Sequence, residues 1–289
     1  MGDSDIAAGI GPTPTGLSRI GPEELRAALA SVKMGMVYEL GTVFGEEMPQ
    51  GPRENLFGFR VSQHHTPLSL TTRESPPFDF SMDVIMASPH VGTHIDGLAH
   101  IQSHGRTYGG HDVRDVFGDH GWKVNGMETS KPIVGRGVLL DVAASRRVVA
   151  LPDRYEITVA DLKTCLEGSR IDIARGDVVL VRTGWYASNY ESDSEAYFAS
   201  QPGVGPDAAI WLYDRGMSVL GTDTAGTDVI PMPERTTHKE LLIDRGVHVI
   251  EIMDLEAVAR DRVHEFLFIC LPLRIVGATG SWVRPVAIV

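Results

Sequence analysis

Three histidines and one aspartate lie within eleven residues of the sequence, in the segment HVGTHIDGLAH. His90, His94, Asp96 and His100 all occupy even-numbered positions. Imidazole nitrogens and carboxylate oxygens together suit zinc, manganese or iron. Such an ion lowers the pKa of a bound water to about 7 and so supplies a nucleophile for attack on a carbonyl carbon. The segment therefore predicts a divalent metal site, with hydrolysis as its chemistry.

The backbone of this segment must bend to bring its ligands together. Three β-branched residues alternate with the polar ones, a pattern typical of a strand. In a fully extended strand His90 and His94 would stand roughly 13 Å apart, whereas each ligating nitrogen must lie about 2 Å from the ion. A helix would align the two histidines but direct Asp96 to the opposite side. Gly92 can resolve this conflict, because a residue without a Cβ atom tolerates a sharp bend.

Composition restricts the partners of such a site. Lys and Arg number 26 against 38 Asp and Glu, so the formal charge is -12, which disfavours nucleic acid and anionic membranes. The two cysteines, Cys165 and Cys270, provide no disulfide framework. The sequence begins without a secretory pattern, and no apolar run reaches the roughly 18 residues of a membrane span. We expect a cytoplasmic protein that acts on a small molecule.

The elements that must position the ligands follow a mixed α/β pattern. Helices are predicted over residues 21–32, 158–168 and 205–216, the second capped by Thr158 with Asp161 three residues on. Val/Ile/Leu-rich runs bounded by Gly or Asp predict strands that are covered on both faces. These runs cover residues 136–143, 176–185, 217–223, 246–255, 266–275 and 281–289. We expect a loose N-terminal arm over residues 1–20 and one domain over 21–289, built around a buried mixed sheet.

Several segments of the chain resemble those of a known protein family. HVGTHIDGLAH is similar to the signature H-x-G-T-H-x-D-x-P-x-H of the cyclase-like metal-dependent hydrolases, which include bacterial kynurenine formamidase and isatin hydrolase. Further family-like segments, among them LGTDTAGTD and HKELLIDRGVHVIE, follow in the expected order, so the resemblance runs from about Met36 to the C-terminus. It implies a single swivelling β/β/α domain with a mixed buried sheet, assembled as a homodimer or homotetramer.

The resemblance also implies roles for particular residues. His90, His94 and Asp96 would bind a first zinc or manganese ion, and Asp96 could bridge to a second ion, so one or two ions per chain are expected. His238 and Glu251 would complete the second position. The sequence leaves an alternative open for each of these two residues. His238 could be an exposed histidine in the first turn of a helix, and Glu251 could form an ion pair with an arginine.

The remaining candidates concern proton transfer and the surroundings of the metal. The resemblance makes His100 the proton donor and acceptor, which suits a neutral histidine close to the ligands. Asp223 ends an apolar strand and is predicted to support the ligands or line the substrate pocket, with a turn at the strand end as the alternative. Tyr108, in the Gly-rich loop after the motif, is a candidate substrate contact.

Departures from the family pattern limit the substrate prediction. Leu98 stands where the signature has Pro, Ile101 follows the last histidine where formamidases have Phe, and the spacing from His238 to Glu251 is one residue longer than in those enzymes. The chain has no G-x-S-x-G nucleophile motif, which favours direct attack by water. We predict hydrolysis of an amide, formamide or cyclic amide C–N bond. A lactone hydrolase, a non-hydrolytic cyclase or dehydratase, and a catalytically silent metal-binding protein are the alternatives.

Overall fold

Nine strands form one sheet in the part of the chain that the structure describes. The structure is a computed structural model, and the residues it describes are 14–51, 60–63 and 83–289. In sheet order the strands are β1 (Val37–Glu39), β15 (Val286–Ile288), β13 (Glu265–Cys270), β7 (Ile133–Asp141), β9 (Val178–Arg182), β11 (Val219–Thr222), β12 (His248–Glu251), β4 (His94–Asp96) and β14 (Gly280–Trp282). Strands β7, β9, β11 and β12 run parallel, and the strands on either side of this block pair antiparallel.

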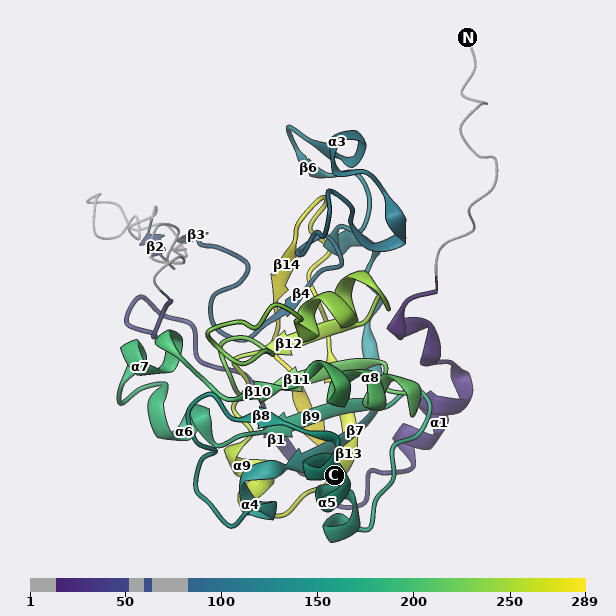
Figure 1. Ribbon diagram of the computed structural model, residues 1–289, viewed down its shortest axis with the longest axis vertical. Coiled ribbons are helices and arrows are strands. Elements are labelled where there is room, and N and C mark those ends of the chain that lie inside the picture. The colour runs from purple at the N-terminus through teal and green to yellow at the C-terminus, as the bar shows by residue number, and fades with distance from the viewer. Residues whose placement is uncertain (1–13, 52–59, 64–82) are drawn as a thin grey trace, which may run out of the picture.

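The parallel strands are buried on both faces, as their apolar sequences predict. Val179 and Val181 of β9 belong to one core cluster, whereas Leu180 belongs to a second cluster on the opposite face. Helices α5 (Val159–Ser169) and α8 (Pro206–Asp214) cover the first face, and α1 (Pro22–Leu29) packs against β7 (Figure 1). The predicted class, a mixed α/β domain around a buried sheet, is therefore confirmed.

The sheet is curled, because its two margins are joined by a short segment of chain. Only Val283, Arg284 and Pro285 separate β14 from β15, although these strands occupy opposite parts of the sheet order. At about 3.3–3.6 Å per residue this link is too short to cross a flat sheet of this width. Backbone hydrogen bonds at the link, from Val283 N to Thr93 O and from Leu40 N to Pro285 O, hold it against both margins.

The other elements lie around this sheet. The remaining helices are α3 (Val113–Val116), α4 (Val142–Ser145), α6 (Trp185–Asn189), α7 (Ser194–Ala199) and α9 (Glu256–Arg260), with 3-10 turns η1 (Gly16–Arg19), η3 (Tyr108–Gly110) and η4 (Met127–Thr129) and a π-helical turn η5 (Lys239–Ile243). Three small pairs of strands are β2 (Arg60–Gln63) with β3 (Asp83–Met86), β5 (Phe117–Gly118) with β6 (Gly121–Trp122), and β8 (Glu156–Ile157) with β10 (Gly203–Val204). Within the described residues, none of the helices combines the length and the apolar composition needed to cross a membrane.

The predicted N-terminal cap of helix α5 is confirmed. Thr158 caps α5, and its hydroxyl accepts a hydrogen bond from the backbone N–H of Asp161, as predicted.

The predicted loose arm over residues 1–20 needs a correction at its C-terminal end. Residues 1–13 lie outside the described residues, but Gly16–Arg19 form η1, which is docked because Gly16 N donates to Gly246 O and Leu17 is buried.

Candidate metal centre

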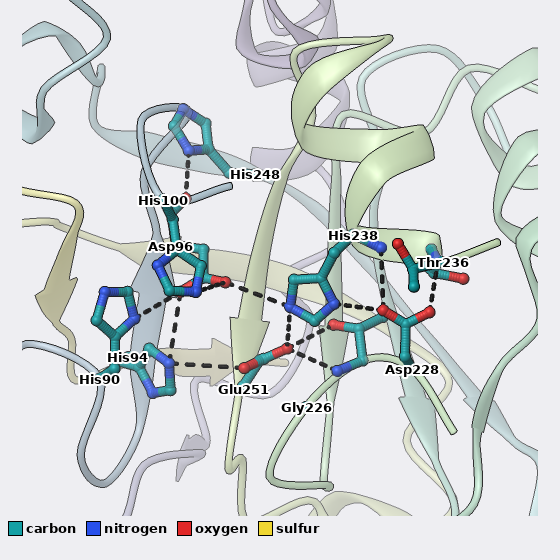
Figure 2. A network of polar contacts seen from close by, with 12 residues as sticks. His90, His94, Asp96, His100, Gly226, Asp228, Thr236, His238, His248 and Glu251 are labelled. Carbon is teal, nitrogen blue, oxygen red and sulfur yellow. Dashed lines mark hydrogen bonds and ion pairs between the residues drawn. The ribbon is translucent and has the colours of Figure 1, made fainter. Parts of the chain in front are cut away.

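The predicted ligands meet where β4 pairs with β12 and β14. His94 lies opposite Glu251 on one side and opposite Trp282 on the other, and Asp96 lies opposite Gly280. Two distant parts of the sequence, the motif around β4 and the strand β12, are thereby placed side by side. Figure 2 shows the resulting group of imidazole and carboxylate side chains pointing toward one another.

The backbone bends at Gly92, as the spacing of the ligands requires. Gly92 has a φ of 59°, in the left-handed region, and a Cβ atom there would lie 2.8 Å from the ring of Phe44. Regular strand begins only at His94, whose Nδ1 lies 2.8 Å from the backbone oxygen of Gly92. His90 and His94 therefore reach the same centre, with ring centroids 5.1 Å apart.

Asp96 lies at the middle of the group. Its Oδ1 is 2.9 Å from His90 Nδ1 and 3.5 Å from His94 Nε2. Its Oδ2 is 3.4 Å from His238 Nε2 and 3.8 Å from His100 Nε2. Burial raises the pKa of the Asp96 carboxyl, but the surrounding imidazoles outweigh burial and hold that pKa well below its usual range.

The donor atoms around Asp96 fit a bound cation. Asp96 is fully buried, yet within the described part of the chain neither of its oxygens has a hydrogen-bond partner of acceptable geometry. The same is true of His90 Nδ1, which is close to Oδ1 but not oriented to share a proton with it. Unpartnered buried lone pairs are costly unless a cation lies between them. Two sets of three residues bring one ligand atom each within 4.8 Å of one another: His90, Asp96 and His100, and His94, Asp96 and Glu251.

Glu251 and His238 join the same centre from the second half of the chain. Glu251 Oε1 is 3.0 Å from His238 Nε2, and Oε2 is 3.6 Å from His94 Nε2. Oε1 also accepts hydrogen bonds from the backbone N–H and the hydroxyl of Thr227. His238 is the N-cap residue of η5 and is 5% exposed, so the alternative of an exposed helical histidine is wrong.

Three of the four imidazoles around Asp96 are held through their other nitrogen, that of His94 by the backbone oxygen of Gly92. His90 Nε2 lies 2.9 Å from the hydroxyl of Thr279, and His238 Nδ1 lies 2.5 Å from Oδ2 of Asp228. Sequence reasoning did not single out Thr279 or Asp228. Asp228 could have been considered because it lies in the family-like segment LGTDTAGTD, together with Asp223.

The structure places two of the predicted residues away from this group. Asp223 is fully buried and accepts hydrogen bonds from Thr183 N, Thr183 Oγ1 and Gly184 N. Burial raises the pKa of its carboxyl to about 6. Tyr108 is buried as well, and its hydroxyl donates to the backbone oxygen of Pro14. Asp223 therefore holds the turn after β9, and Tyr108 anchors the segment before η1.

His100 differs from the other three histidines. Its side chain is 31% exposed, and its ring stacks on that of His90 with centroids 4.0 Å apart. Burial, together with His90 and His238, lowers the pKa of His100 to about 4 even though Asp96 and Glu251 oppose the shift. His100 is therefore a neutral imidazole at pH 7 and lies on the accessible side of the centre.

Comparisons with known proteins point to one family. A family model described as "Putative cyclase" matches residues 38–229. The kynurenine formamidase of Geobacillus thermodenitrificans is 25% identical over 221 residues, which is 76% of this chain and 86% of that protein. A crystal structure described as a novel cyclase has a TM-score of 0.86 at 26% identity and covers 95% of this chain and 94% of its own. Isatin hydrolase A from Ralstonia solanacearum has a TM-score of 0.63 at 22% identity, covering 96% and 99%, and at that identity it shares the fold alone.

Proposed function

The chain belongs to the cyclase family, and on that premise we propose that it is a metal-dependent hydrolase that cleaves a C–N bond in a small molecule. The bond is that of an amide, a formamide or a cyclic amide. The similarity to a kynurenine formamidase supports a bond of this type.

One observation carries the proposal. Asp96 is a buried carboxylate with no hydrogen-bond partner among the described residues, and four imidazole nitrogens surround it at 2.9–3.8 Å. A site built only for stability would satisfy such a group with hydrogen bonds. When a divalent ion is bound there, it supplies a water acidic enough to attack a carbonyl carbon at neutral pH.

The side chains divide into those that bind and one that moves a proton. His90, His94 and Asp96 would bind the ion, and His238 and Glu251 would extend the ligand set. All five side chains are buried or nearly so. They would therefore keep bulk water from competing with the substrate carbonyl for a place beside the ion.

His100 is the proton carrier in this proposal. Its Nε2 takes a proton from the attacking water while the C–O bond forms, and returns it to the leaving nitrogen as the C–N bond breaks. An accessible, neutral imidazole beside the ligands is suited to this exchange, which requires the group to both accept and donate.

Metal analysis combined with turnover assays tests the proposal. Metal per chain is measured on untagged protein, and hydrolysis of N-formylkynurenine, isatin and simple lactones is followed after chelation and after zinc or manganese is restored. We expect at least one ion per chain and turnover of an amide-type substrate that is lost with the metal and regained with it. Turnover of lactones alone would instead support a lactone hydrolase. Bound metal with no hydrolysis of any substrate would favour a non-hydrolytic or silent protein.

A further inference from the structure

We propose that Asp228 is a positioning residue that fixes the orientation and tautomer of His238 and thereby sets the affinity of the centre for its metal. The inference rests on the proposed function only in that His238 is taken as a ligand. It concerns the chain's own residues, and turnover is not needed to test it.

The contacts of Asp228 tie one buried carboxylate to both the ring and the backbone of the histidine. Oδ2 lies 2.5 Å from His238 Nδ1 and accepts from His238 N at 3.2 Å, while Oδ1 accepts from Thr237 N at 2.5 Å. Asp228 is 1% exposed. Both oxygens are therefore acceptors for groups at the start of η5 (Figure 2), and the carboxylate is shielded from bulk solvent.

This arrangement determines which nitrogen of His238 faces the metal centre. The oxygens of Asp228 already accept backbone N–H groups, so the contact with Nδ1 requires the imidazole to donate. Nε2 is then the nitrogen directed at Glu251 Oε1, 3.0 Å away, and at Asp96 Oδ2, 3.4 Å away. Nε2 consequently presents a lone pair to an ion, and the carboxylate behind the ring makes that nitrogen a stronger ligand.

Asp228 is itself held by a fully buried amide. The side-chain nitrogen of Gln201 donates to the backbone oxygens of Asp228, at 2.8 Å, and Gly226, while its side-chain oxygen accepts from Ala225 N. The same loop supplies Thr227, which donates to Glu251. One short loop thus positions both of the downstream residues that the metal centre uses.

Asp223 provides a matched control, because it lies in the same loop and is equally buried. It also accepts three hydrogen bonds, but they come from Thr183 and Gly184, and none comes from an imidazole within the described residues. A purely structural role for Asp228 predicts that D223N and D228N lower stability and leave metal affinity unchanged in both. A positioning role predicts that only D228N lowers the affinity for the metal.

The test is a calorimetric titration of Mn²⁺ into chelator-treated wild type, D228N, D228E and D223N. We expect D228N to bind Mn²⁺ about 10–100-fold more weakly, D228E to recover part of this loss, and D223N to bind as the wild type does. Equal affinity in D228N and wild type, or equal weakening in D223N and D228N, would overturn the inference.

A second measurement does not depend on whether D228N folds. In Zn²⁺-loaded wild type, ¹⁵N NMR of labelled histidine reports which nitrogen of each ring carries the proton. We expect His238 to carry it on Nδ1, and a proton on Nε2 would overturn the inference. A protein that binds metal in this way but hydrolyses nothing would refute the proposed function and leave the role of Asp228 standing.

Discussion

The hydroxyl of Thr93 donates a 2.5 Å hydrogen bond to the backbone oxygen of Ile252. Ile252 directly follows Glu251 and has a φ of 55°, a conformation that β-branched residues adopt only when their surroundings enforce it. Thr93 directly precedes His94. The bond therefore ties together the two segments that carry the candidate ligands His94 and Glu251, next to the strained backbone of Ile252.

Replacing Thr93 by valine should remove this tie without changing the shape of the side chain. We expect T93V to lose about 1–3 kcal/mol of unfolding free energy, because a buried backbone acceptor is left unpaired. T93S keeps the hydroxyl and should retain most of the stability. Urea denaturation of the three proteins measures the difference, and a T93V curve that superimposes on the wild type would contradict the structural role.

Removing a buried ligand should abolish stabilisation by metal. For the wild type, metal at a hundred times its Kd should raise the unfolding free energy by about 2.7 kcal/mol. H94A should show no such gain, whereas replacing the exposed His120 by alanine should leave it intact. Thermal unfolding with and without Mn²⁺ provides the comparison. An unchanged metal response in H94A would mean that His94 is not a ligand.

Substitution of His100 should separate proton transfer from metal binding. We expect H100N to retain the metal content of the wild type and to lose about 10²–10⁴-fold in kcat. Metal analysis and steady-state kinetics on the same preparation measure both effects. Loss of metal in H100N would reassign His100 to the ligand set with His90 and Asp96, and wild-type turnover would exclude it as the proton carrier.

The capping network of α5 predicts a pH dependence of stability that is independent of the metal. Burial raises the pKa of Asp161, but hydrogen bonds from Thr158, Arg146 and Tyr155 outweigh burial and hold it below its usual value. Asp161 therefore contributes stability above its unfolded pKa of about 3.9, and this contribution is lost as the pH falls through the lower folded value.

The variant D161N isolates this contribution. At pH 7 we expect it to lose about 1.5–3 kcal/mol, the range for hydrogen bonds to a charged group, and the difference from wild type should shrink as the pH falls below about 4. Urea denaturation between pH 7 and pH 3 measures both curves. D153N, at an exposed aspartate, should remain within about 0.5 kcal/mol of wild type. A D161N deficit that stays constant over this range would argue against an ionised Asp161 as its source.

Much of the fold could be predicted because its signals are local. The runs that became β7, β9 and β11 are mainly apolar, as is typical of strands buried on both faces, whereas β12 combines Val249 and Ile250 with His248 and Glu251. Thr158 and Asp161 sit at the spacing of a capping box. The last predicted strand, by contrast, is two strands at opposite parts of the sheet, since the closure of a curled sheet depends on long-range pairing that no short window of sequence contains.

The clustering of the candidate ligands could be predicted from the sequence, whereas the residues that hold them in place could not. His90, His94, Asp96 and His100 follow one spacing, and Gly92 supplies the bend that this spacing demands. Asp223 and Asp228 are both aspartates in one loop, and the sequence cannot tell which of them turns toward an imidazole. That choice depends on the path of the loop around Gln201, which comes from another part of the chain.

The pairing of β4 with β12 joins residues separated by more than half the length of the chain. Contacts of such high sequence separation form late, because the entropy of closing a long loop must be overcome before they contribute. The complete set of candidate ligands is therefore assembled only when β4 has paired with β12. A metal that uses ligands from both strands would therefore bind the folded chain more tightly than the unfolded one, and would stabilise the finished fold rather than start its folding.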